Sequence, residues 1–403
     1  MRELYNNVNY KKRAERAIAH GSLTNSKRPT TFVQGVYPTH IKRAYGSTVV
    51  DADENAYLDF IGGLGTNLFG YGNPEIGRSV THAMQSGGSV FSMGSVAEVE
   101  YAEKVKGIFP FLDRVRFLKT GSEGCVAAVR IARAFTGNQM ILSEGYHGWT
   151  DEFVQLTEPA HGVPQIGWAK NLSDYRMNTE VAAVIIEPVI TDHSPERVKW
   201  LQNLRDDCTK NGVVLIYDET ITAFRFPQYS VARYFNILPD LWIGGKAIGG
   251  GLPLSIVGGR ADIMESDYFV SSTWAGDRLA IAAGTTAIDL LYNEFKIDDL
   301  WTFGTEFMEK FNAISPKVQL EGYPTRGIFK YQDDIFKALF MQEMCKAKIL
   351  LGPSWFYNKF LHKQMENVIS VAEAVVKKIS YSQVLLQGDM PESPFAEKVR
   401  NAY

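Results

Sequence analysis

The sequence predicts a large α/β domain built on a mostly parallel sheet, together with a smaller α+β domain. Through the middle of the chain, short runs rich in Val, Ile and Leu alternate with helical stretches. Strands of that composition are typical of parallel sheets that helices cover on both faces. A chain of 403 residues also exceeds what a single hydrophobic core usually spans, so two domains are expected.

Composition and charge exclude several classes of partner. Apolar residues make up 45% of the chain, charged residues 22%, and the net charge is -3 at pH 7. These values are close to globular averages and give no electrostatic basis for binding nucleic acid or an anionic membrane. The N-terminal stretch lacks the apolar core of a secretory signal, and no apolar run approaches the roughly 20 residues of a membrane span. We therefore expect a cytoplasmic protein.

The cysteines indicate a reducing environment. Cys125, Cys208 and Cys345 are far apart in the sequence and form no CxxC or Cys/His ligand spacing. This spacing argues against a disulfide framework and against a structural zinc site. We expect no metal ion in this protein.

Local sequence patterns predict the individual strands and helices. Alternating apolar residues flank the turn at 51–55, which predicts a hairpin, and residues 96–108 read as a helix. The apolar residues that share one face of this helix are Val96, Val99, Ala102, Val105 and Ile108. The strands of the parallel sheet are expected within 114–120, 181–189, 212–219 and 241–246.

A change of pattern near Tyr292 suggests the domain boundary. Long amphipathic helical stretches follow it, with a strand-like piece near 318–319. We expect an N-terminal segment, 1–48, that contributes to the small domain or to dimer contacts. A large domain at 49–292 and a small C-terminal domain at 293–403 complete the prediction.

Unusual residues follow the predicted strands, where ligands of parallel sheets bind. After the first strand, "GSEG" opens a helix with Gly121 and Ser122, and a helix start with glycines can hold a phosphate. The alternative is a serine that caps the helix, with Glu123 in the first turn.

Two charged residues lie at the ends of later predicted strands. Asp218 closes "GVVLIYD", where a buried carboxylate needs a positive partner, and the alternatives are a metal ligand or a helix cap. Lys246 stands in "WIGGKAIGGG", where its glycine neighbours leave room for a flat ligand beside the amine. An amine held at the end of a core strand suits Schiff-base chemistry.

The loop "GYHGW" adds an aromatic ring and an imidazole. Tyr146 could stack on a planar ligand, and His147 could cap or position it, although packing is the commoner role of such an aromatic residue. A phosphate, a planar ring, a ring cation facing Asp218 and a carbonyl that reacts with Lys246 are the features of pyridoxal 5′-phosphate (PLP). The combination indicates a PLP site.

From about Gly35 to Ile379 the chain resembles the class III, or ω-type, PLP-dependent aminotransferases, in the branch that contains glutamate-1-semialdehyde aminomutase. The resemblance is carried, in order, by "FLKTGSEGCVAAVRIARAFTG", "GYHGW", "VAAVIIEP", "LIYDETITAFR", "PDLWIGGKAIGGGLPLSIVGGRADIM" and "STWAGDRLAIAAG". It implies fold type I with a mostly parallel, seven-stranded type of sheet. It also implies a homodimer whose active sites lie at the subunit interface.

The resemblance implies a role for each matching residue. Lys246 forms the Schiff base with PLP and then moves the proton, while Asp218 keeps the ring nitrogen protonated. Gly121 and Ser122, followed by Glu123, form the phosphate segment, and Tyr146, next to His147, stacks on the ring. The remaining matches are Thr220 on the other ring face, Glu187 near the substrate side, and Thr273, which reaches the phosphate from the partner subunit. Packing or ordinary hydrogen bonding is the alternative for Thr220 and Glu187.

Three segments depart from the family pattern. Where the aminomutase branch has a glutamate in "PSQFEAG", this chain has Tyr357 in "PSWFYNK". The early "SWGP"-like segment is "GGLGTN" here, and "AGDR" replaces the usual "SGNP", which puts Asp277 and Arg278 near the predicted subunit interface. Tyr357 argues against the aminomutase reaction.

These observations predict a PLP-dependent aminotransferase with a ping-pong mechanism. It would move an amino group from an amino acid or amine donor to a small aldehyde or ketone. The alternatives are an aminomutase on the same scaffold, a catalytically silent PLP-binding homologue, and a decarboxylase or epimerase. Arg225 and Arg326 are candidates for binding a substrate carboxylate.

Overall fold

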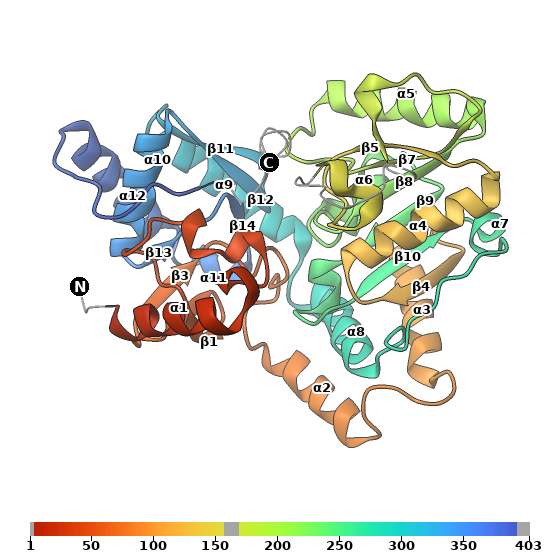
Figure 1. Ribbon diagram of the computed structural model, residues 1–403, viewed down its shortest axis with the longest axis horizontal. Coiled ribbons are helices and arrows are strands. Elements are labelled where there is room, and N and C mark those ends of the chain that lie inside the picture. Colours follow the sequence, from red (N-terminus) through yellow and green to blue (C-terminus); the bar gives the residue numbers. More distant parts are fainter. Residues whose placement is uncertain (1–3, 157–168, 393–403) are drawn as a thin grey trace. The chain divides into compact units, whose positions relative to one another are not determined.

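The computed structural model describes residues 4–156 and 169–392, which form two compact units (Figure 1). The first unit combines the residues up to 73 with those from 299 onward, and the second unit consists of 74–298. The expected segments differ from these units at two places: residues 49–73 join the first unit, and residues 293–298 belong to the second. For residues 49–73 the reason is a strand pairing between distant parts of the chain.

The first unit contains a four-stranded sheet in the order β1-β2-β3-β13. The expected hairpin is confirmed by β2 (Thr48–Asp51) and β3 (Ala56–Asp59), which pair antiparallel. Its turn is held by Asp51, which accepts hydrogen bonds from the backbone of Asp53 and Asn55 at 2.9 and 2.8 Å. Strand β3 then pairs in parallel with β13 (Ile349–Leu350), which ties the hairpin to the C-terminal half of the chain.

A three-stranded sheet and several helices complete the first unit. The strands of this sheet are β11 (Val318–Tyr323), β12 (Arg326–Tyr331) and β14 (Ser354–Phe356), with β12 in the centre. The strand-like piece expected near 318–319 is therefore the start of β11. The other elements are α1 (Tyr5–Ala17), β1 (Ile41–Tyr45), α9 (Ile297–Asn312), α10 (Asp334–Lys346), α11 (Lys359–His362) and α12 (Met365–Ser380).

The second unit is built on a seven-stranded sheet in the order β4-β10-β9-β8-β7-β5-β6. All neighbouring pairs are parallel except those made by β10, so the expected α/β fold with a mostly parallel sheet is confirmed. The strands are β4 (Arg114–Leu118), β5 (Met140–Glu144), β6 (Lys170–Asn171), β7 (Val181–Ile186), β8 (Val214–Glu219), β9 (Leu241–Gly244) and β10 (Ser255–Gly259).

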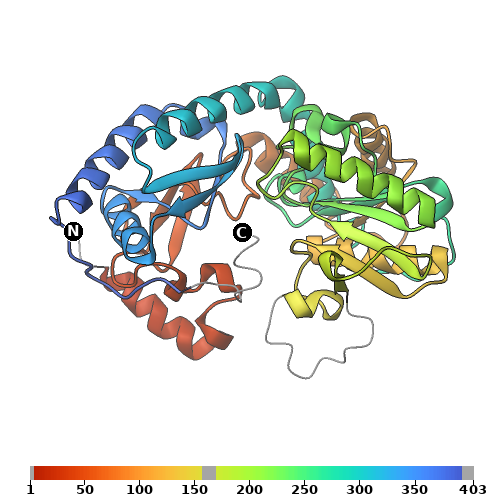
Figure 2. The same ribbon diagram turned by 90° about the horizontal axis from the view of Figure 1, so that it is seen from above.

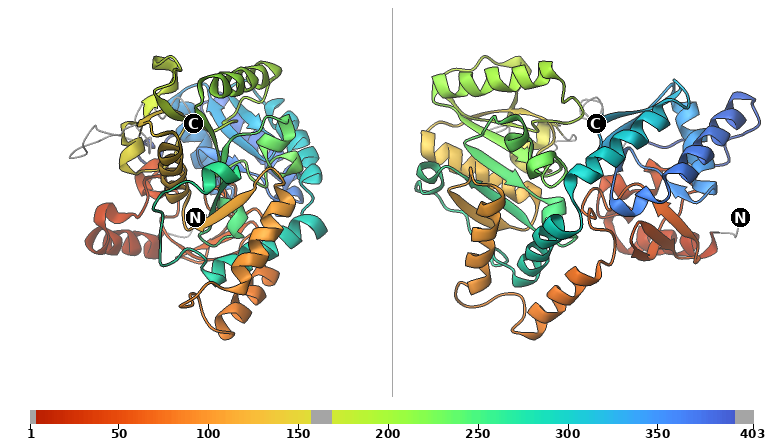
Figure 3. Two further views of the ribbon diagram at one scale, coloured as in Figure 1. Left: turned by 90° about the vertical axis from the view of Figure 1, so that its right-hand side faces the viewer. Right: turned by 180° about the vertical axis from the view of Figure 1, so that it is seen from behind.

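Helices cover both faces of this sheet, with α4 (Gly121–Thr136) on one side and α5 (Pro195–Asn211) on the other (Figure 2). Successive side chains of β8 lie on opposite faces of the sheet and therefore contact different helices. Ile216 belongs to the core under α4, and Tyr217 lies among charged side chains of α5. The further helices of the unit, visible in Figure 3, are α2 (Pro74–Gln85), α3 (Val96–Ile108), α6 (Val231–Phe235), α7 (Ala261–Met264) and α8 (Arg278–Asn293).

Helix α3 has the predicted bounds, and the predicted apolar face is buried in its C-terminal half, at Val105 and Ile108, but not at its start. Tyr101, Val105 and Ile108 are buried, whereas Val96 and Val99 are 73% and 59% exposed. The apolar period predicted the helix correctly, because period depends on local geometry. It could not show which part of the apolar stripe meets the sheet.

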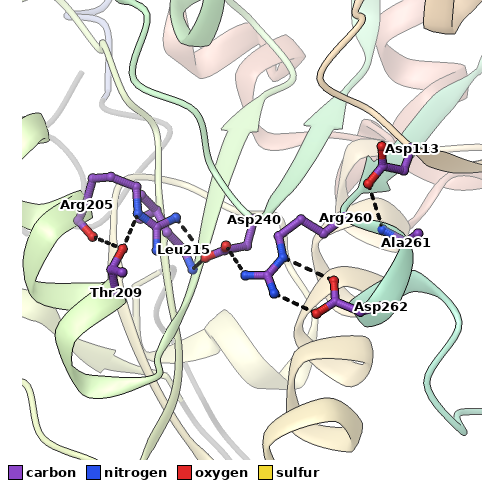
Figure 4. A network of polar contacts seen from close by, with 8 residues as sticks. All are labelled: Asp113, Arg205, Thr209, Leu215, Asp240, Arg260, Ala261 and Asp262. Carbon is purple, nitrogen blue, oxygen red and sulfur yellow. Dashed lines mark hydrogen bonds and ion pairs between the residues drawn. The ribbon is translucent and has the colours of Figure 1, made fainter.

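An ionic cluster centred on the buried Asp240 anchors the amino end of β9 (Figure 4). Asp240, directly before the strand, accepts hydrogen bonds from Arg205 and Arg260 at 2.8 and 2.9 Å. It also accepts one from the backbone of Leu215 at 2.8 Å, which joins β9 to β8. The cluster therefore fixes the strand whose other end leads to Lys246.

Among the helices of the described residues, none combines the length and the apolar character that a membrane crossing requires.

Candidate active site

The topology of the large sheet gathers the predicted site residues at one edge. Strand β10 lies antiparallel between β4 and β9, so β4 runs in the same direction as the parallel strands β9, β8, β7 and β5. Their carboxyl ends therefore share an edge, which is where ligands of such sheets bind. The residues at these ends are Gly121 after β4, Tyr146 after β5, Glu187 after β7, Asp218 within the end of β8, and Lys246 after β9.

Asp218 has a hydrogen-bond partner in His147. The Nδ1 atom of His147 lies 2.9 Å from Oδ2 of Asp218, and Nε2 lies 3.2 Å from the carbonyl oxygen of Glu144. Both neighbours are acceptors, so the ring donates to both when it carries a proton on each nitrogen. Burial by itself would raise the pKa of Asp218, yet the hydrogen bond and charge of His147 hold this pKa below its ordinary value.

Cys125 is a third member of this cluster that the sequence did not single out. Its Sγ atom lies 3.2 Å from Oδ2 of Asp218, and all three side chains are buried. A helix that begins at Gly121 places residue 125 one turn later on the same side, which was the available signal. The possible ligand atoms of Cys125, His147 and Asp218 lie within 4.8 Å of one another, a spacing that a metal ion could use. Their mutual hydrogen bonds explain this closeness without an ion.

The start of α4 is capped by Thr120, not by Ser122. The hydroxyl of Thr120 accepts a hydrogen bond from the backbone of Glu123 at 3.2 Å, and the Glu123 carboxylate accepts one from the backbone of Thr120 at 2.9 Å. This reciprocal capping box corrects the alternative in which Ser122 caps the helix. Gly121 and Ser122 thus occupy the first turn, where backbone N–H groups have no carbonyl one turn earlier to bond.

The "GYHGW" loop packs closely against this helix start. A Cβ atom on Gly148 would lie 2.6 Å from Cβ of Ser122, and Gly148 has a φ of 103° that favours glycine. The backbone of Tyr146 donates to Oε1 of Glu187 at 2.8 Å. Glu187 therefore holds the loop through its backbone, which agrees with the hydrogen-bonding alternative expected for this residue; the sequence did not indicate which group would be its partner.

Thr220 links the phosphate segment to the lysine segment. A Cβ atom on Gly121 would lie 2.9 Å from Cγ2 of Thr220, and one on Gly245 would lie 3.0 Å from the same atom. Lys246 follows directly with a φ of 47°, which is uncommon for a residue with a side chain. Strained backbone of this kind occurs often at functional sites.

Some predicted residues are not part of this contact set. Thr273 is exposed in the turn before α8, and the contacts described above do not include it. Arg225 and Arg326, the candidates for a substrate carboxylate, are each only 1% exposed. Arg225 belongs to the second unit and Arg326 to β12 of the first.

Comparison with known proteins identifies the family. The family profile described as aminotransferase class-III matches residues 32–174 and 161–330. A glutamate-1-semialdehyde 2,1-aminomutase from Desulfotalea psychrophila is 35% identical over 339 residues, covering 76% of this chain and 78% of the relative. The chain belongs to the class III aminotransferases.

Two solved structures share the fold of this chain. The FumI protein of Sphingopyxis sp. MTA144, solved in its PLP internal aldimine form, has a TM-score of 0.86 at 22% identity, covering 96% of this chain and 99% of that one. An omega-transaminase from Sphaerobacter thermophilus has a TM-score of 0.81 at 23% identity, covering 92% and 97%. At these identities the likeness establishes the fold, which is fold type I.

The class III family uses pyridoxal phosphate, and the residues of this chain fit that group. The glycines at 121 and 245 let the backbone approach Thr220 closely from both segments, and the buried hydroxyl oxygen of Thr220 has no hydrogen-bond partner among the described residues. Asp218 supplies a carboxylate for a ring N–H, and the start of α4 suits a phosphate. A bound ring would also give the Thr220 hydroxyl a possible partner.

Proposed function

We propose that this class III protein is a PLP-dependent aminotransferase, which moves an amino group from an amino acid or amine to a small aldehyde or ketone. The observation that carries the proposal is the placement of Asp218 and Lys246 at the carboxyl ends of the adjacent parallel strands β8 and β9, where Asp218 pairs in register with Ile243. When bound, PLP supplies the electron sink that allows a proton to leave the carbon next to an amino group.

The residues of the chain would divide the remaining work. Asp218 would accept the N–H of the ring, held in its charged form by His147. Lys246 would bind the aldehyde carbon of the cofactor and, when released by substrate, carry the proton at its Nζ atom. Gly121 and Ser122 would bind the phosphate, with Glu123 capping the helix behind them. Tyr146 would cover one face of the ring and Thr220 the other.

The assembly belongs to the same proposal. A homodimer with active sites at the subunit interface would give the exposed Thr273 its role, because it could then reach the phosphate bound by the partner. The partners of the protein would be small molecules, an amino donor and an oxo acceptor. We propose a cytoplasmic location.

Tyr357 favours the transferase over the aminomutase. At this position the aminomutase branch carries a glutamate, whereas the Tyr357 side chain is buried and its hydroxyl donates to Sδ of Met365 at 3.5 Å. The side chain at this position therefore offers a phenol where the aminomutase branch offers a carboxylate to retain an intermediate. The aminomutase reaction remains the second candidate, since the relative from Desulfotalea psychrophila is named for it.

One experiment separates the two reactions. The PLP-loaded protein is mixed with one amino donor at a time, such as glutamate or alanine, without acceptor. A transferase releases about one equivalent of oxo acid per site, and the cofactor absorbance changes permanently to that of the pyridoxamine form. An aminomutase releases no oxo acid and instead isomerises glutamate-1-semialdehyde by moving its amino group by one carbon.

Lys246→Ala tests the assignment of the lysine. We expect PLP to lose its covalent attachment, measured by mass spectrometry after borohydride reduction, together with all turnover. Lys170→Ala, a lysine on the edge strand β6, is the matched control and should retain both. Turnover by Lys246→Ala at the wild-type rate would refute the proposed mechanism.

A further inference from the structure

Cys125 lies against the carboxylate that would meet the ring nitrogen of the cofactor. Its Sγ atom is 3.2 Å from Oδ2 of Asp218, and the residue is 1% exposed. An ionised carboxylate only accepts hydrogen bonds, so the thiol is the donor. Oδ2 of Asp218 therefore accepts from Cys125 and from His147 at the same time.

The two oxygen atoms of Asp218 differ in what they accept. Among the described residues, the one hydrogen bond that Oδ1 accepts comes from the backbone of Thr220 at 3.0 Å. A carboxylate oxygen offers about two acceptor positions, so Oδ2 is filled by its two donors while Oδ1 keeps one position open. The two oxygens therefore differ in their free acceptor positions before any ligand binds.

We propose that Cys125 is a positioning residue for the cofactor ring: by donating to Oδ2 beside His147, it fixes the rotation of the Asp218 carboxylate and leaves Oδ1 to accept the ring N–H. The inference rests on the proposed function, because it requires a bound heteroaromatic cation. It goes beyond that function by assigning a role to a side chain on α4.

The surroundings of Cys125 suit a permanent donor. Burial, together with the charge of Asp218 and the hydrogen bond to it, raises the pKa of the thiol well above its ordinary value. The thiol therefore keeps its proton at neutral pH. Cys125 also lies one helical turn after Gly121, so the rigid start of α4 would hold the phosphate and orient the ring carboxylate together.

The test compares variants of the full-length chain. PLP is titrated into the cofactor-free wild type, Cys125→Ala and Cys125→Ser, and the nitrogen signal of ring-¹⁵N-labelled PLP is recorded for each. Cys125→Ala should bind PLP about fivefold more weakly, the effect of losing one net hydrogen bond. Its ring-nitrogen signal should move toward that of free PLP. Cys125→Ser keeps a donor and should restore both readouts.

Cys208→Ala is the matched control for removing a buried thiol. Cys208 is 0% exposed, lies on α5 and should leave both readouts unchanged. Where Cys125→Ala does not fold, Cys125→Val replaces the thiol by a side chain of similar volume without a donor.

Two results would overturn the inference. One is a Cys125→Ala protein with the affinity and the ring signal of the wild type. The other is a Cys125→Ser protein that behaves like Cys125→Ala, which would show that packing alone matters. The Asp218→Ala variant shows whether a negative result refutes only the role of Cys125 or the proposed cofactor site as a whole. Only the role of Cys125 fails if Asp218→Ala changes both readouts and Cys125→Ala changes neither. The proposed site fails if Asp218→Ala changes neither.

Discussion

His147 Nδ1 lies 2.9 Å from Asp218 Oδ2, although the two residues stand 71 positions apart in the chain. The pair is buried, with side-chain exposures of 0% and 4%. A buried carboxylate is stable only with a donor or cation beside it. His147, in the loop after β5, therefore supplies the hydrogen-bond partner that the buried Asp218 at the end of β8 requires.

His147→Ala should destabilise the cofactor-free protein by about 2 kcal/mol, because it leaves the buried Asp218 carboxylate with only the Cys125 thiol and the Thr220 N–H as donors among the residues that the structure describes. Urea unfolding at neutral pH measures the change. His82→Ala, an exposed histidine on α2, should change the free energy of unfolding by less than about 0.5 kcal/mol. Equal stability of the two variants would contradict the ion pair.

Gly148→Ala should weaken PLP binding strongly. The new Cβ would lie 2.6 Å from Cβ of Ser122 and would require a residue with a side chain at a φ of 103°. Strain of this kind costs on the order of 1–3 kcal/mol, so we expect a loss of affinity of roughly tenfold or more in a PLP titration. Gly107→Ala is the control, since nothing lies within 4 Å of its added Cβ. This substitution within α3 should leave PLP affinity unchanged.

Glu219 should make stability depend on pH. The residue is 0% exposed, and its carboxylate accepts from the backbone of Val231 and Ala232 and from the hydroxyl of Thr222. Burial outweighs these bonds and raises the pKa of Glu219 from 4.5 to about 7. Between these values the folded protein holds a proton that the unfolded chain has lost, so stability should fall as pH rises from about 4.5 to about 7.

The size of this effect is on the order of 3 kcal/mol, since each pH unit between the two pKa values contributes about 1.4 kcal/mol. Urea unfolding of Glu219→Gln at pH 5 and pH 8 should lack this difference, whatever its constant effect on stability. Glu309→Gln, on the exposed side of α9, should keep the wild-type dependence. The same pH dependence in wild type and Glu219→Gln would assign it to another group.

Asp240→Ala should remove the anchor of β9. Asp240 is 6% exposed and pairs with Arg205, whose side chain is 16% exposed, and with the half-exposed Arg260. Its loss leaves the Arg205 guanidinium and the Leu215 N–H without this acceptor and should cost about 2 kcal/mol in urea unfolding. Asp262→Ala breaks an ion pair with the same Arg260, but both partners there are about half exposed (51% and 52%). That control should cost less than about 1 kcal/mol. A larger loss in Asp262→Ala than in Asp240→Ala would contradict the assignment.

Much of the fold can be predicted from the chain because it depends on local pattern. Apolar runs and their spacing predicted the parallel strands, the hairpin around 51–55 and the bounds of α3. The order of strands and helices also placed Asp218 and Lys246 at strand ends, since every parallel strand ends at the same edge. These features depend on neighbours in sequence and on the period of the side chains.

Other features depend on contacts between distant residues. The pairing of β3 with β13, the exposure of Val96 and Val99, and the role of Glu187 beneath Tyr146 have no local signal in the chain. The choice between Thr120 and Ser122 as helix cap depended on a difference of two positions, which a sequence pattern does not resolve.

The sequence by itself determined the type of fold, the family resemblance and the residues that carry the reactive groups. Only the tertiary structure decided that His147 and Cys125 share one oxygen of Asp218 and that Thr220 lies between the glycines at 121 and 245. The spacing of apolar side chains along a segment depends only on whether that segment is a strand or a helix. The partner of a buried carboxylate is set by which loops and helices the sheet brings together, and that depends on the packing of the whole unit.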